Sequence, residues 1–216
     1  ISVKCKNPIS LFFLRSHMGN TRKWFTSDHH FAHANIIKYC NRSFDTVQEM
    51  DTKLISLWNS VVGDEDIVYY VGDFTLGNSH YFKKCIMELN GQINILPGSH
   101  DYRWLAEFHS KYTSRSGQPV KVLPPLVSLE FPELGDGKHP QVIVLCHYAM
   151  RVWDRSHHGA WHLYGLSHGS LPGQGLSFDV GVDCNEFKPI SLAQVAERMV
   201  AKKAILTDQV NVRCLE

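Results

Sequence analysis

The chain has 216 residues and a formal net charge of +1 at neutral pH. This length suits one domain with a sizeable core, and the near-neutral charge excludes the basic field that marks general nucleic-acid binders. The six cysteines show no CxxC spacing, which argues against a zinc ribbon or a secreted disulfide scaffold. No apolar run is long enough to span a membrane, so we predict a cytoplasmic protein with no membrane partner.

The N-terminal stretch is predicted to lie outside the fold. The apolar run Ile9–Leu14 resembles a short signal core, but no small-residue cleavage site follows it. The residues Ser16-His17-Met18 are typical of a cloning junction ahead of a native start at Met18. We therefore predict that residues 1–17 are a vector-derived or non-native leader and that residues 18–216 form a single domain.

The first half of the chain alternates predicted strands and helices. Strands are predicted at Lys23–Thr26, Ile67–Val71 and Gln92–Leu96. Helices are predicted at Thr46–Val61, with Asp45 as its cap, and at Asn78–Leu89. This alternation favours a largely parallel central sheet.

The second half is predicted to form more strands and one late helix. Val120–Phe131 and Gln141–Cys146 are expected to pair as an antiparallel hairpin. His162–Gly165 and Phe178–Val182 are expected as short strands, and Ser191–Ala201 as a capped helix. The predicted arrangement is two packed sheets with helices outside.

Acidic and imidazole groups recur where the predicted strands end. The groups are Asp28 and His30, Asp73, His100 and Asp101, His147, and His168. In an α/β sheet the carboxyl ends of the strands gather along one edge, where ligands bind. Carboxylates and imidazoles aimed at one point suit a divalent cation such as Zn²⁺, Mn²⁺ or Fe²⁺. One such turn could be a polar loop, but five at strand ends indicate a site.

Short motifs follow one another in the order of a known family. They are Asp28-His-His30, Gly72-Asp73, Gly98-Ser-His-Asp101, Cys146-His147 and Gly165-Leu-Ser-His-Gly169. The chain after Met18 therefore resembles the calcineurin-like metallophosphoesterases, whose forms are DxH, GD, GNHD, a lone H and GHxH. It looks most like the compact bacterial and phage-type members. The resemblance implies a four-layer αββα sandwich, with two mixed sheets flanked by helices and a two-metal site.

The resemblance also implies which residues hold the metals. The first divalent transition metal (Mn, Fe, Zn or Ni) would be held by Asp28, His30, Asp73 and His168. Asp73 would bridge to a second metal, held further by His147, by the Asn of GNHD and by the first His of GHxH. In this family's chemistry, metal-activated hydroxide attacks the phosphorus of a phosphodiester or phosphomonoester.

His100 and Asp101 would complete that chemistry. The resemblance implies that His100 stabilises the developing charge or protonates the leaving oxygen, and that Asp101 orients its ring. The expected substrate is a small phosphate ester or a nucleotide.

The chain departs from the family at two positions that serve the second metal. Ser99 stands in place of Asn, and Leu166 stands in place of the first His of GHxH. We therefore predict one tight metal site, a weak or empty second site, and reduced activity. The alternatives are a deliberately inactivated variant and a catalytically silent metal-binding scaffold. If two metals bind tightly, His29, His33 and His157 are candidate substitute ligands.

Residues outside the motifs have two interpretations. Arg151 and Trp153 follow His147 and would form a substrate wall, with arginine against phosphate and Trp153 against a base or aryl group. The alternative is a surface loop with a partly buried aromatic residue. Asp179 and Asp183 are expected to fix a late strand and turn rather than to bind metal.

Overall fold

The structure is a computed structural model that describes residues 21–108 and 111–213. Its first sheet has the strand order β4-β3-β2-β1-β9. The bounds are β1 (Lys23–Thr26), β2 (Ile67–Val71), β3 (Gln92–Leu96), β4 (Val120–Val122) and β9 (Ile190–Ser191). Strands β1 to β4 are parallel and β9 is antiparallel to β1. The three strands predicted in the first half are confirmed, whereas the predicted leader, residues 1–17, lies outside the described residues.

The second sheet has the strand order β5-β6-β7-β8. Its strands are β5 (Leu126–Phe131), β6 (Gln141–Cys146), β7 (Trp161–Tyr164) and β8 (Ser177–Asp179). The pair β5–β6 is antiparallel, while β6–β7 and β7–β8 are parallel. Both sheets are therefore mixed, as predicted.

The predicted long strand Val120–Phe131 is wrong, because it is two strands in two different sheets. Its first part is β4, which pairs with β3, and its last part is β5, which pairs with β6. Pro124 and Pro125 lie between them and have no backbone N–H to donate to a sheet. The chain therefore leaves the first sheet at the prolines and enters the second.

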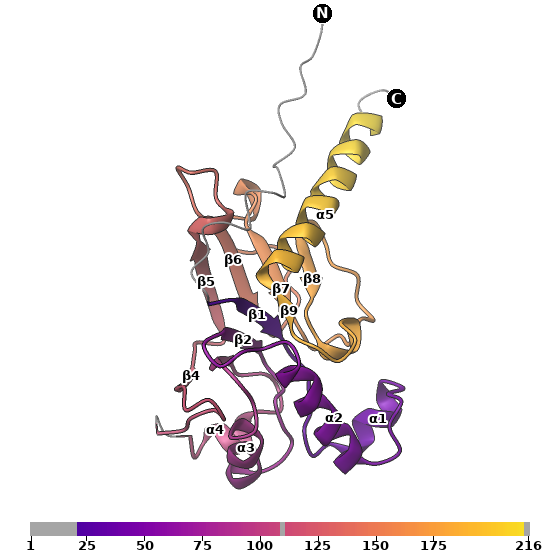
Figure 1. Cartoon of the computed structure of the whole chain (residues 1–216). Helices are drawn as coiled ribbons and strands as arrows, with labels where there is room; N and C mark the ends of the chain where they lie inside the picture. Colours follow the sequence, from indigo (N-terminus) through magenta and orange to yellow (C-terminus); the bar gives the residue numbers. More distant parts are fainter. Residues whose placement is uncertain (1–20, 109–110, 214–216) are drawn as a thin grey trace, which may run out of the picture.

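The described part of the chain also contains five α-helices and three short 3₁₀ segments. The α-helices are α1 (Ala34–Tyr39), α2 (Val47–Asn59), α3 (Ser79–Ile86), α4 (Tyr102–Leu105) and α5 (Leu192–Arg213). The 3₁₀ segments are η2 (Pro132–Leu134), η3 (Ser156–His158) and η4 (Val182–Cys184). Figure 1 shows α1 to α4 on the side of the first sheet that faces away from β5 to β8.

Helix α2 begins one residue later than its predicted cap implies. The N-cap is Thr46, whose hydroxyl accepts a hydrogen bond from the Glu49 N–H at 3.1 Å. The Glu49 carboxylate accepts in turn from the Asp45 N–H at 3.0 Å. Asp45 thus takes part through its backbone, and the prediction that it caps the helix is wrong.

Two apolar clusters, one on each face of the first sheet, explain why the central strands are continuous apolar runs in the sequence. Val68 and Tyr70 of β2 pack with α2 and α3 in one cluster. Val71 of the same strand packs in a second cluster with the strands of the other sheet, beside half-buried Tyr69. Successive side chains of a strand point to opposite faces, so a strand covered on both faces is apolar throughout.

The layer outside the second sheet differs from the predicted helical layer. Leu192, Val195 and Met199 of α5 belong to the cluster between the two sheets. The outer face of β6 packs instead against Met150 and Trp153 of the loop that follows it. The described residues therefore form an α/β sandwich of two mixed sheets, in which α5 closes the inner core and a loop covers β6.

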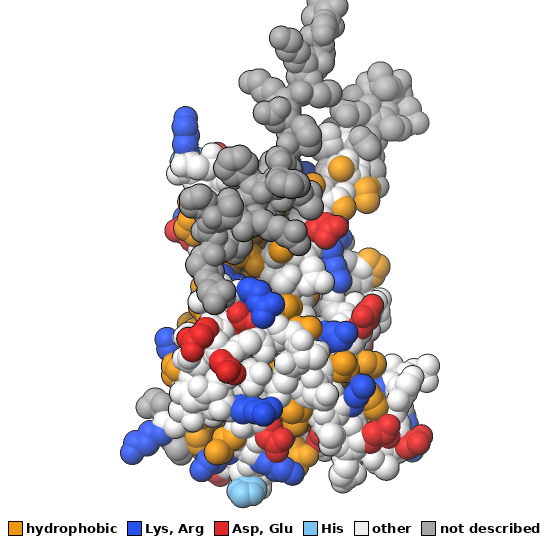
Figure 2. All heavy atoms as spheres, in the orientation of Figure 1, with side chains coloured by type: hydrophobic (Ala, Val, Ile, Leu, Met, Phe, Trp, Pro, Cys, Tyr) orange, Lys and Arg blue, Asp and Glu red, His pale blue; other side chains and the backbone are white. Residues whose placement is uncertain are grey.

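The surface carries mixed charges. On the face drawn in Figure 2, Lys and Arg side chains alternate with Asp and Glu in small groups. Within residues 21–108 and 111–213, no helix has the length and apolar character needed to cross a membrane.

Candidate metal centre

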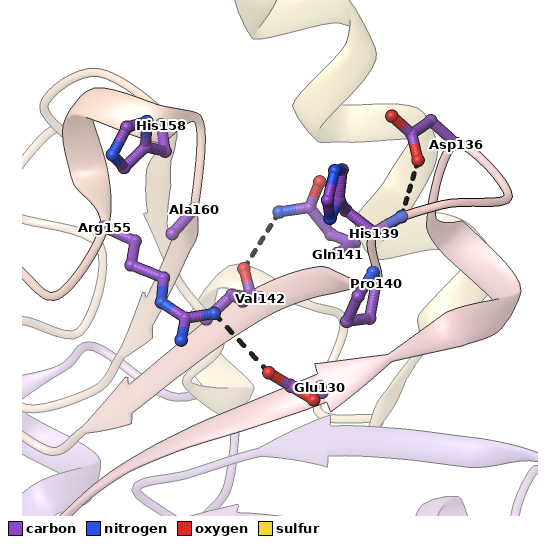
Figure 3. Close-up of a pocket in the computed structure, with 9 residues that line it drawn as sticks. All are labelled: Glu130, Asp136, His139, Pro140, Gln141, Val142, Arg155, His158 and Ala160. Carbon is purple, nitrogen blue, oxygen red and sulfur yellow. Dashed lines mark hydrogen bonds and ion pairs between the residues drawn. The ribbon is translucent and has the colours of Figure 1, made fainter.

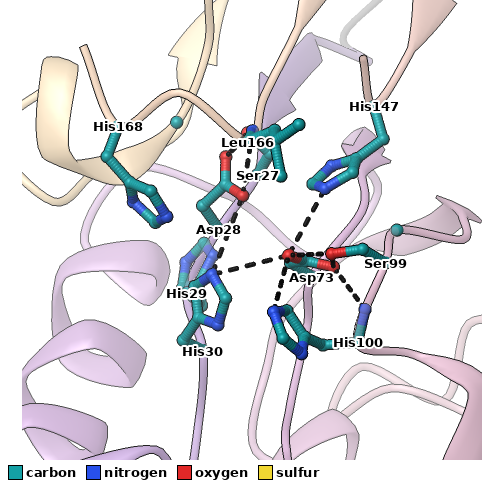
Figure 4. A network of polar contacts seen from close by, with 12 residues as sticks. Ser27, Asp28, His29, His30, Asp73, Ser99, His100, His147, Leu166 and His168 are labelled. Atoms are coloured by element: carbon teal, nitrogen blue, oxygen red, sulfur yellow. Dashed lines mark hydrogen bonds and ion pairs between the residues drawn. The ribbon is translucent and has the colours of Figure 1, made fainter. Parts of the chain in front are cut away.

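The predicted metal ligands come together at the carboxyl ends of strands from both sheets. Asp28 follows β1, and Asp73 follows β2. His147 follows β6 directly, and His168 follows β7. Figure 4 shows these side chains facing one another, with His30 beside Asp28. The topology thus brings together residues that are far apart in the sequence.

Asp73 lies at the centre of the group. Its Oδ2 is 3.3 Å from His147 Nε2 and 3.6 Å from His30 Nε2. It is also 3.9 Å from His100 Nε2. On the other side, His30 Nε2 is 3.9 Å from Asp28 Oδ1. Asp28, His30, Asp73 and His147 are all buried, so these groups face each other rather than solvent.

Two imidazole nitrogens in this buried group have no hydrogen-bond partner among the described residues. They are His30 Nε2 and His147 Nε2. His147 Nδ1 lies 2.8 Å from the Val71 carbonyl, which only accepts, so this nitrogen carries a proton and, in the neutral ring that binds metal, the lone pair is on Nε2. Buried polar atoms without partners are costly, and a metal ion would satisfy both nitrogens.

The side chains define adjacent groups of potential ligand atoms. Asp28, His30 and His168 form one group, and Asp28, Asp73 and His147 form another, each with ligand atoms within 4.8 Å of one another. The first contains three of the four predicted ligands of the first metal. The second gains Asp28 beside the predicted Asp73 and His147, so it offers three protein ligands rather than two. These clusters could hold a metal ion.

A further potential group is formed by Cys40, His168 and Asp183. It shares His168 with the first group. Burial raises the pKa of the Cys40 thiol to about 11, which disfavours the thiolate that would bind metal.

The pKa values of the predicted ligands reflect their burial and their contacts with one another. Burial raises the pKa of Asp28 to about 7 and lowers the pKa of His30 to about 2. For Asp73, burial acts upward, but contact with His147 and the N–H of His100 outweigh it and hold the pKa below its usual range. Burial acts downward on His147, but Asp73 outweighs it and raises the pKa to about 9. A bound cation would favour ionised carboxylates and neutral imidazoles throughout the group.

The backbone is strained where it carries these groups. Asp28, His30, Asp73, Leu166 and His168 have φ values of 59°, 53°, 59°, 66° and 46°. Non-glycine residues rarely adopt positive φ, at a cost on the order of 1–3 kcal/mol each. Such strain collects at functional sites, where the surrounding structure holds it in place.

Glycines permit the close approach of the turns. A Cβ on Gly72, whose φ is 89°, would lie 2.5 Å from His147 Nδ1. A Cβ on Gly98 would collide with the Asp73 carboxylate. The glycines of the two motifs are therefore required by contacts inside the site.

The two positions that depart from the family pattern both contact the ligand carboxylates. The Ser99 hydroxyl donates to Asp73 Oδ2 at 3.1 Å. The Leu166 N–H donates to Asp28 Oδ2 at 3.0 Å, while the leucine side chain is 40% exposed. Both residues thus hold a predicted ligand in place, but neither side chain offers an imidazole nitrogen or an amide oxygen to a metal.

His100 lies at the rim, with its side chain 44% exposed. Its N–H donates to Asp73 Oδ1 at 2.8 Å, and its ring centroid is 5.4 Å from that of His30. The ring is therefore next to the predicted metal ligands and partly exposed, and its role toward a substrate stays a prediction.

The prediction that Asp101 orients the His100 ring is wrong. The Asp101 carboxylate is fully buried and accepts four hydrogen bonds of 2.7–2.9 Å. The donors are the N–H groups of Asp73, Phe74 and Gly98 and the Trp104 indole. Asp101 therefore ties the β2 and β3 turns together rather than acting on a substrate.

The predicted substrate wall is corrected in part. The Trp153 indole donates to the Ala160 carbonyl at 2.9 Å, and its ring packs on His162 and on the outer face of β6. Its role is therefore packing, which was the alternative interpretation. The Arg151 side chain is exposed, and its assignment to phosphate stays a prediction.

The neighbouring histidines occupy different environments. His29 is fully buried among aromatic rings, with Nδ1 3.0 Å from the Tyr70 hydroxyl, and burial lowers its pKa to about 3. His33 is half-buried, with Nδ1 3.4 Å from His30 Nδ1. Asp179 accepts from Ser167 and Gly181 and fixes its turn, as predicted.

A surface cavity of about 600 Å³ lies away from this centre, near the start of β6. Figure 3 shows its walls, which include His139, His158 and the ion pair of Arg155 with Glu130. It contains none of the predicted site residues.

The sequence predicts a structural role for Asp183, but its contacts with His168 and Arg42 are seen only in the fold. Asp183 Oδ2 lies 2.7 Å from His168 Nδ1, so this aspartate orients a predicted metal ligand. Arg42 binds the same carboxylate across a sequence separation of 141 residues. No local pattern signals such a pair, because the fold alone brings the two residues together.

Comparison with known proteins gives relatives but no family. No family model matches the chain. An uncharacterized protein of Methanocaldococcus jannaschii is 48% identical over 86 residues, which is 39% of this chain and 49% of that protein. The gene 66 protein of Mycobacterium phage L5 is 36% identical over 87 residues, which is 39% of this chain and 41% of that protein. The chain therefore spans less than half the length of these relatives.

The fold is similar to that of a solved structure. A crystal structure of a protein of unknown function from Aquifex aeolicus aligns with a TM-score of 0.60 and 20% sequence identity. The alignment covers 82% of this chain and 99% of that chain. At this identity the likeness concerns the fold alone.

Proposed function

We propose that this chain is a metal-dependent phosphoesterase of the calcineurin-like type, acting on phosphodiesters and also on phosphomonoesters. The observation that carries the proposal is the meeting of two aspartates and three histidines at strand ends from both sheets. Two buried imidazole nitrogens within this group, His30 Nε2 and His147 Nε2, lack partners among the described side chains. The motif order and the strained ligand turns support the same conclusion.

Each residue has a separate task in this proposal. Asp28, His30, Asp73 and His168 would hold the first divalent cation, and Asp28, Asp73 and His147 would face a second. When bound, the metal supplies a nucleophile from water and neutralises charge on the phosphate. The Val71 carbonyl keeps the proton on His147 Nδ1 and so leaves Nε2 free as a ligand.

His100 would serve the leaving group. Its ring is exposed at the rim, and its Nε2 lies 3.9 Å from Asp73 Oδ2. A protonated His100 could stabilise the developing charge or give a proton to the leaving oxygen.

The second site is expected to be the weaker one. Ser99 and Leu166 add no strong ligand to it, which leaves three protein ligands. Activity should therefore be lower than in a centre with two fully ligated ions.

The proposal is tested by hydrolysis of bis(4-nitrophenyl) phosphate during a Mn²⁺ titration. We expect Mn²⁺-dependent turnover that is lost in Asp28→Ala and raised in the double variant Ser99→Asn/Leu166→His. Turnover that is unchanged in Asp28→Ala would contradict the proposal. Equal turnover by the unaltered chain and the double variant would contradict the expectation that Ser99 and Leu166 weaken the second metal site and lower activity.

A silent metal-binding scaffold is the second candidate, and the altered positions Ser99 and Leu166 favour it. In that case Mn²⁺ should raise the melting temperature because it binds only the folded state. Neither the unaltered chain nor the double variant would then hydrolyse the substrate.

A further inference from the structure

Arg42 is a buried cation directly behind the ligand turn that follows β1. Its side chain is inaccessible to solvent. Its Nη2 donates to the Asp28 carbonyl at 2.7 Å, and its Nη1 donates to the His29 carbonyl at 2.8 Å. The guanidinium therefore binds the backbone of the turn that carries Asp28 and His30.

Asp183 of η4 receives the other side of the guanidinium. Its Oδ1 accepts from Arg42 Nε at 2.8 Å, and its Oδ2 accepts from Arg42 Nη2 at 2.8 Å. The same Oδ2 lies 2.7 Å from His168 Nδ1. Contacts with His168 and Arg42 outweigh the effect of burial and keep the pKa of Asp183 below its usual range.

The contacts of Arg42 and Asp183 thus connect two segments that carry predicted metal ligands. The connection begins at the backbone of the β1 turn, passes through Arg42 and Asp183, and ends on the ring of His168, which follows β7 in the other sheet. A guanidinium is planar and its N–H groups point in fixed directions. Arg42 therefore fixes the positions of the groups that it binds, in addition to supplying a positive charge. A buried ion pair is often no more stabilising than apolar packing, so stability alone is a weak reason for this arrangement.

We propose that Arg42 and Asp183 are positioning residues that preset the first metal site without touching the ion. This inference rests on the proposed metal binding. The pair directs His168 Nε2 and fixes the turn that carries Asp28 and His30. Metal affinity then depends on the pair, because ligands held in place lose less freedom when the ion binds.

The test is Mn²⁺ binding measured by isothermal titration calorimetry on the full chain. The first variant is Asp183→Asn, which keeps the size of the side chain but loses its charge. The second is Arg42→Lys, which keeps the charge but loses the planar set of guanidinium N–H donors. The matched control is Asp66→Asn, which removes the charge of another buried aspartate paired with an arginine, Arg22, at 3.0 Å. Asp66 lies at the start of β2, at the opposite end of the first sheet.

We expect both positioning variants to bind Mn²⁺ roughly 10–100-fold more weakly, the usual cost of losing an outer partner of a ligand. The control should bind as the unaltered chain does. Affinities of the positioning variants within threefold of the unaltered chain would overturn this inference alone. Absence of binding by the unaltered chain would overturn the proposed function and this inference with it.

The absorption spectrum of bound Co²⁺ separates positioning from general destabilisation. The visible bands of the ion should shift in Asp183→Asn, because the direction of His168 changes, and should stay in place in Asp66→Asn. Identical Co²⁺ spectra in the unaltered chain and Asp183→Asn would contradict a positioning role. Arg42→Lys provides the same comparison if Asp183→Asn fails to fold.

Discussion

The two ends of the first sheet both bury aspartates, but the aspartates have different surroundings. At the start of β2, Asp66 accepts hydrogen bonds from the N–H groups of Arg22 and Gly63 and from the Trp24 indole, all within 2.9 Å. At the other end, Asp28 and Asp73 face imidazole nitrogens, two of which lack a partner among the described residues. At the start of β2 the carboxylate is bound by donors of the protein itself, whereas at the other end of the sheet nitrogen atoms remain that a metal ion would bind.

The surroundings of these aspartates distinguish a structural carboxylate from a proposed metal ligand. Burial pushes the pKa of Asp66 upward, but its backbone donors outweigh burial and lower it. Burial raises the pKa of Asp28 to about 7. Asp101 shows that the pKa direction alone does not decide, since burial raises its pKa although four donors surround it. Asp28 and Asp73 also accept hydrogen bonds, and what sets them apart is the buried imidazole nitrogens that lie 3.3–3.9 Å from their carboxylates.

The largest effect on stability is expected for Asp101→Ala. The change leaves four donors, three of them buried, without their acceptor, at about 1–3 kcal/mol for each unsatisfied buried group. We expect the free energy of unfolding in urea to fall by more than about 3 kcal/mol. The exposed Asp154, which accepts from Ser128, provides a control as Asp154→Ala. A loss as small as that of the control would mean that Asp101 is not the structural carboxylate described above.

Asp73→Ala should mainly affect metal binding. Asp73 Oδ2 lies within 3.9 Å of three histidine nitrogens and belongs to the proposed ligands of both metals. We expect Mn²⁺ affinity to fall by more than the roughly 100-fold that loss of an outer partner costs. In EDTA, this variant should lose less stability than Asp101→Ala. If Asp73→Ala were instead less stable than Asp101→Ala in EDTA, the distinction between Asp101 as a structural carboxylate and Asp73 as a metal ligand would be contradicted.

Asp66→Asn should give a smaller and pH-dependent loss of stability. The folded pKa of Asp66 is lowered, so its contribution is present above the unfolded pKa of about 3.9 and disappears as pH falls through the folded value. We expect the variant to cost about 1–3 kcal/mol at pH 7, the penalty for disturbed buried hydrogen bonds to a charge. The difference from the unaltered chain should shrink below about pH 4. A difference that stays constant from pH 7 to pH 3 would contradict this explanation.

Much of the fold could be predicted from local patterns. The apolar runs of β1, β2, β3 and β6 have the predicted bounds, because burial on both faces leaves an unambiguous signal. The split between β4 and β5 was missed because strand propensity on both sides of Pro124-Pro125 masks the change of sheet. The position of α5 was missed because an apolar helix face does not say which layer it packs against.

The candidate site shows the same limit. The clustering of Asp28, Asp73 and His147 could be predicted, because the carboxyl ends of the strands share an edge. The partners of Asp101 and Trp153 could not, since neighbours in the sequence do not fix where a side chain points. Arg42 and Asp183 meet only through the tertiary structure.

The most direct test is a crystal structure of the Mn²⁺-soaked protein with anomalous diffraction data. Our account predicts a strong peak within bonding distance of Asp28, His30, Asp73 and His168, and a weaker one or none beside His147. A strong peak elsewhere, or no peak among these residues at saturating Mn²⁺, would contradict it.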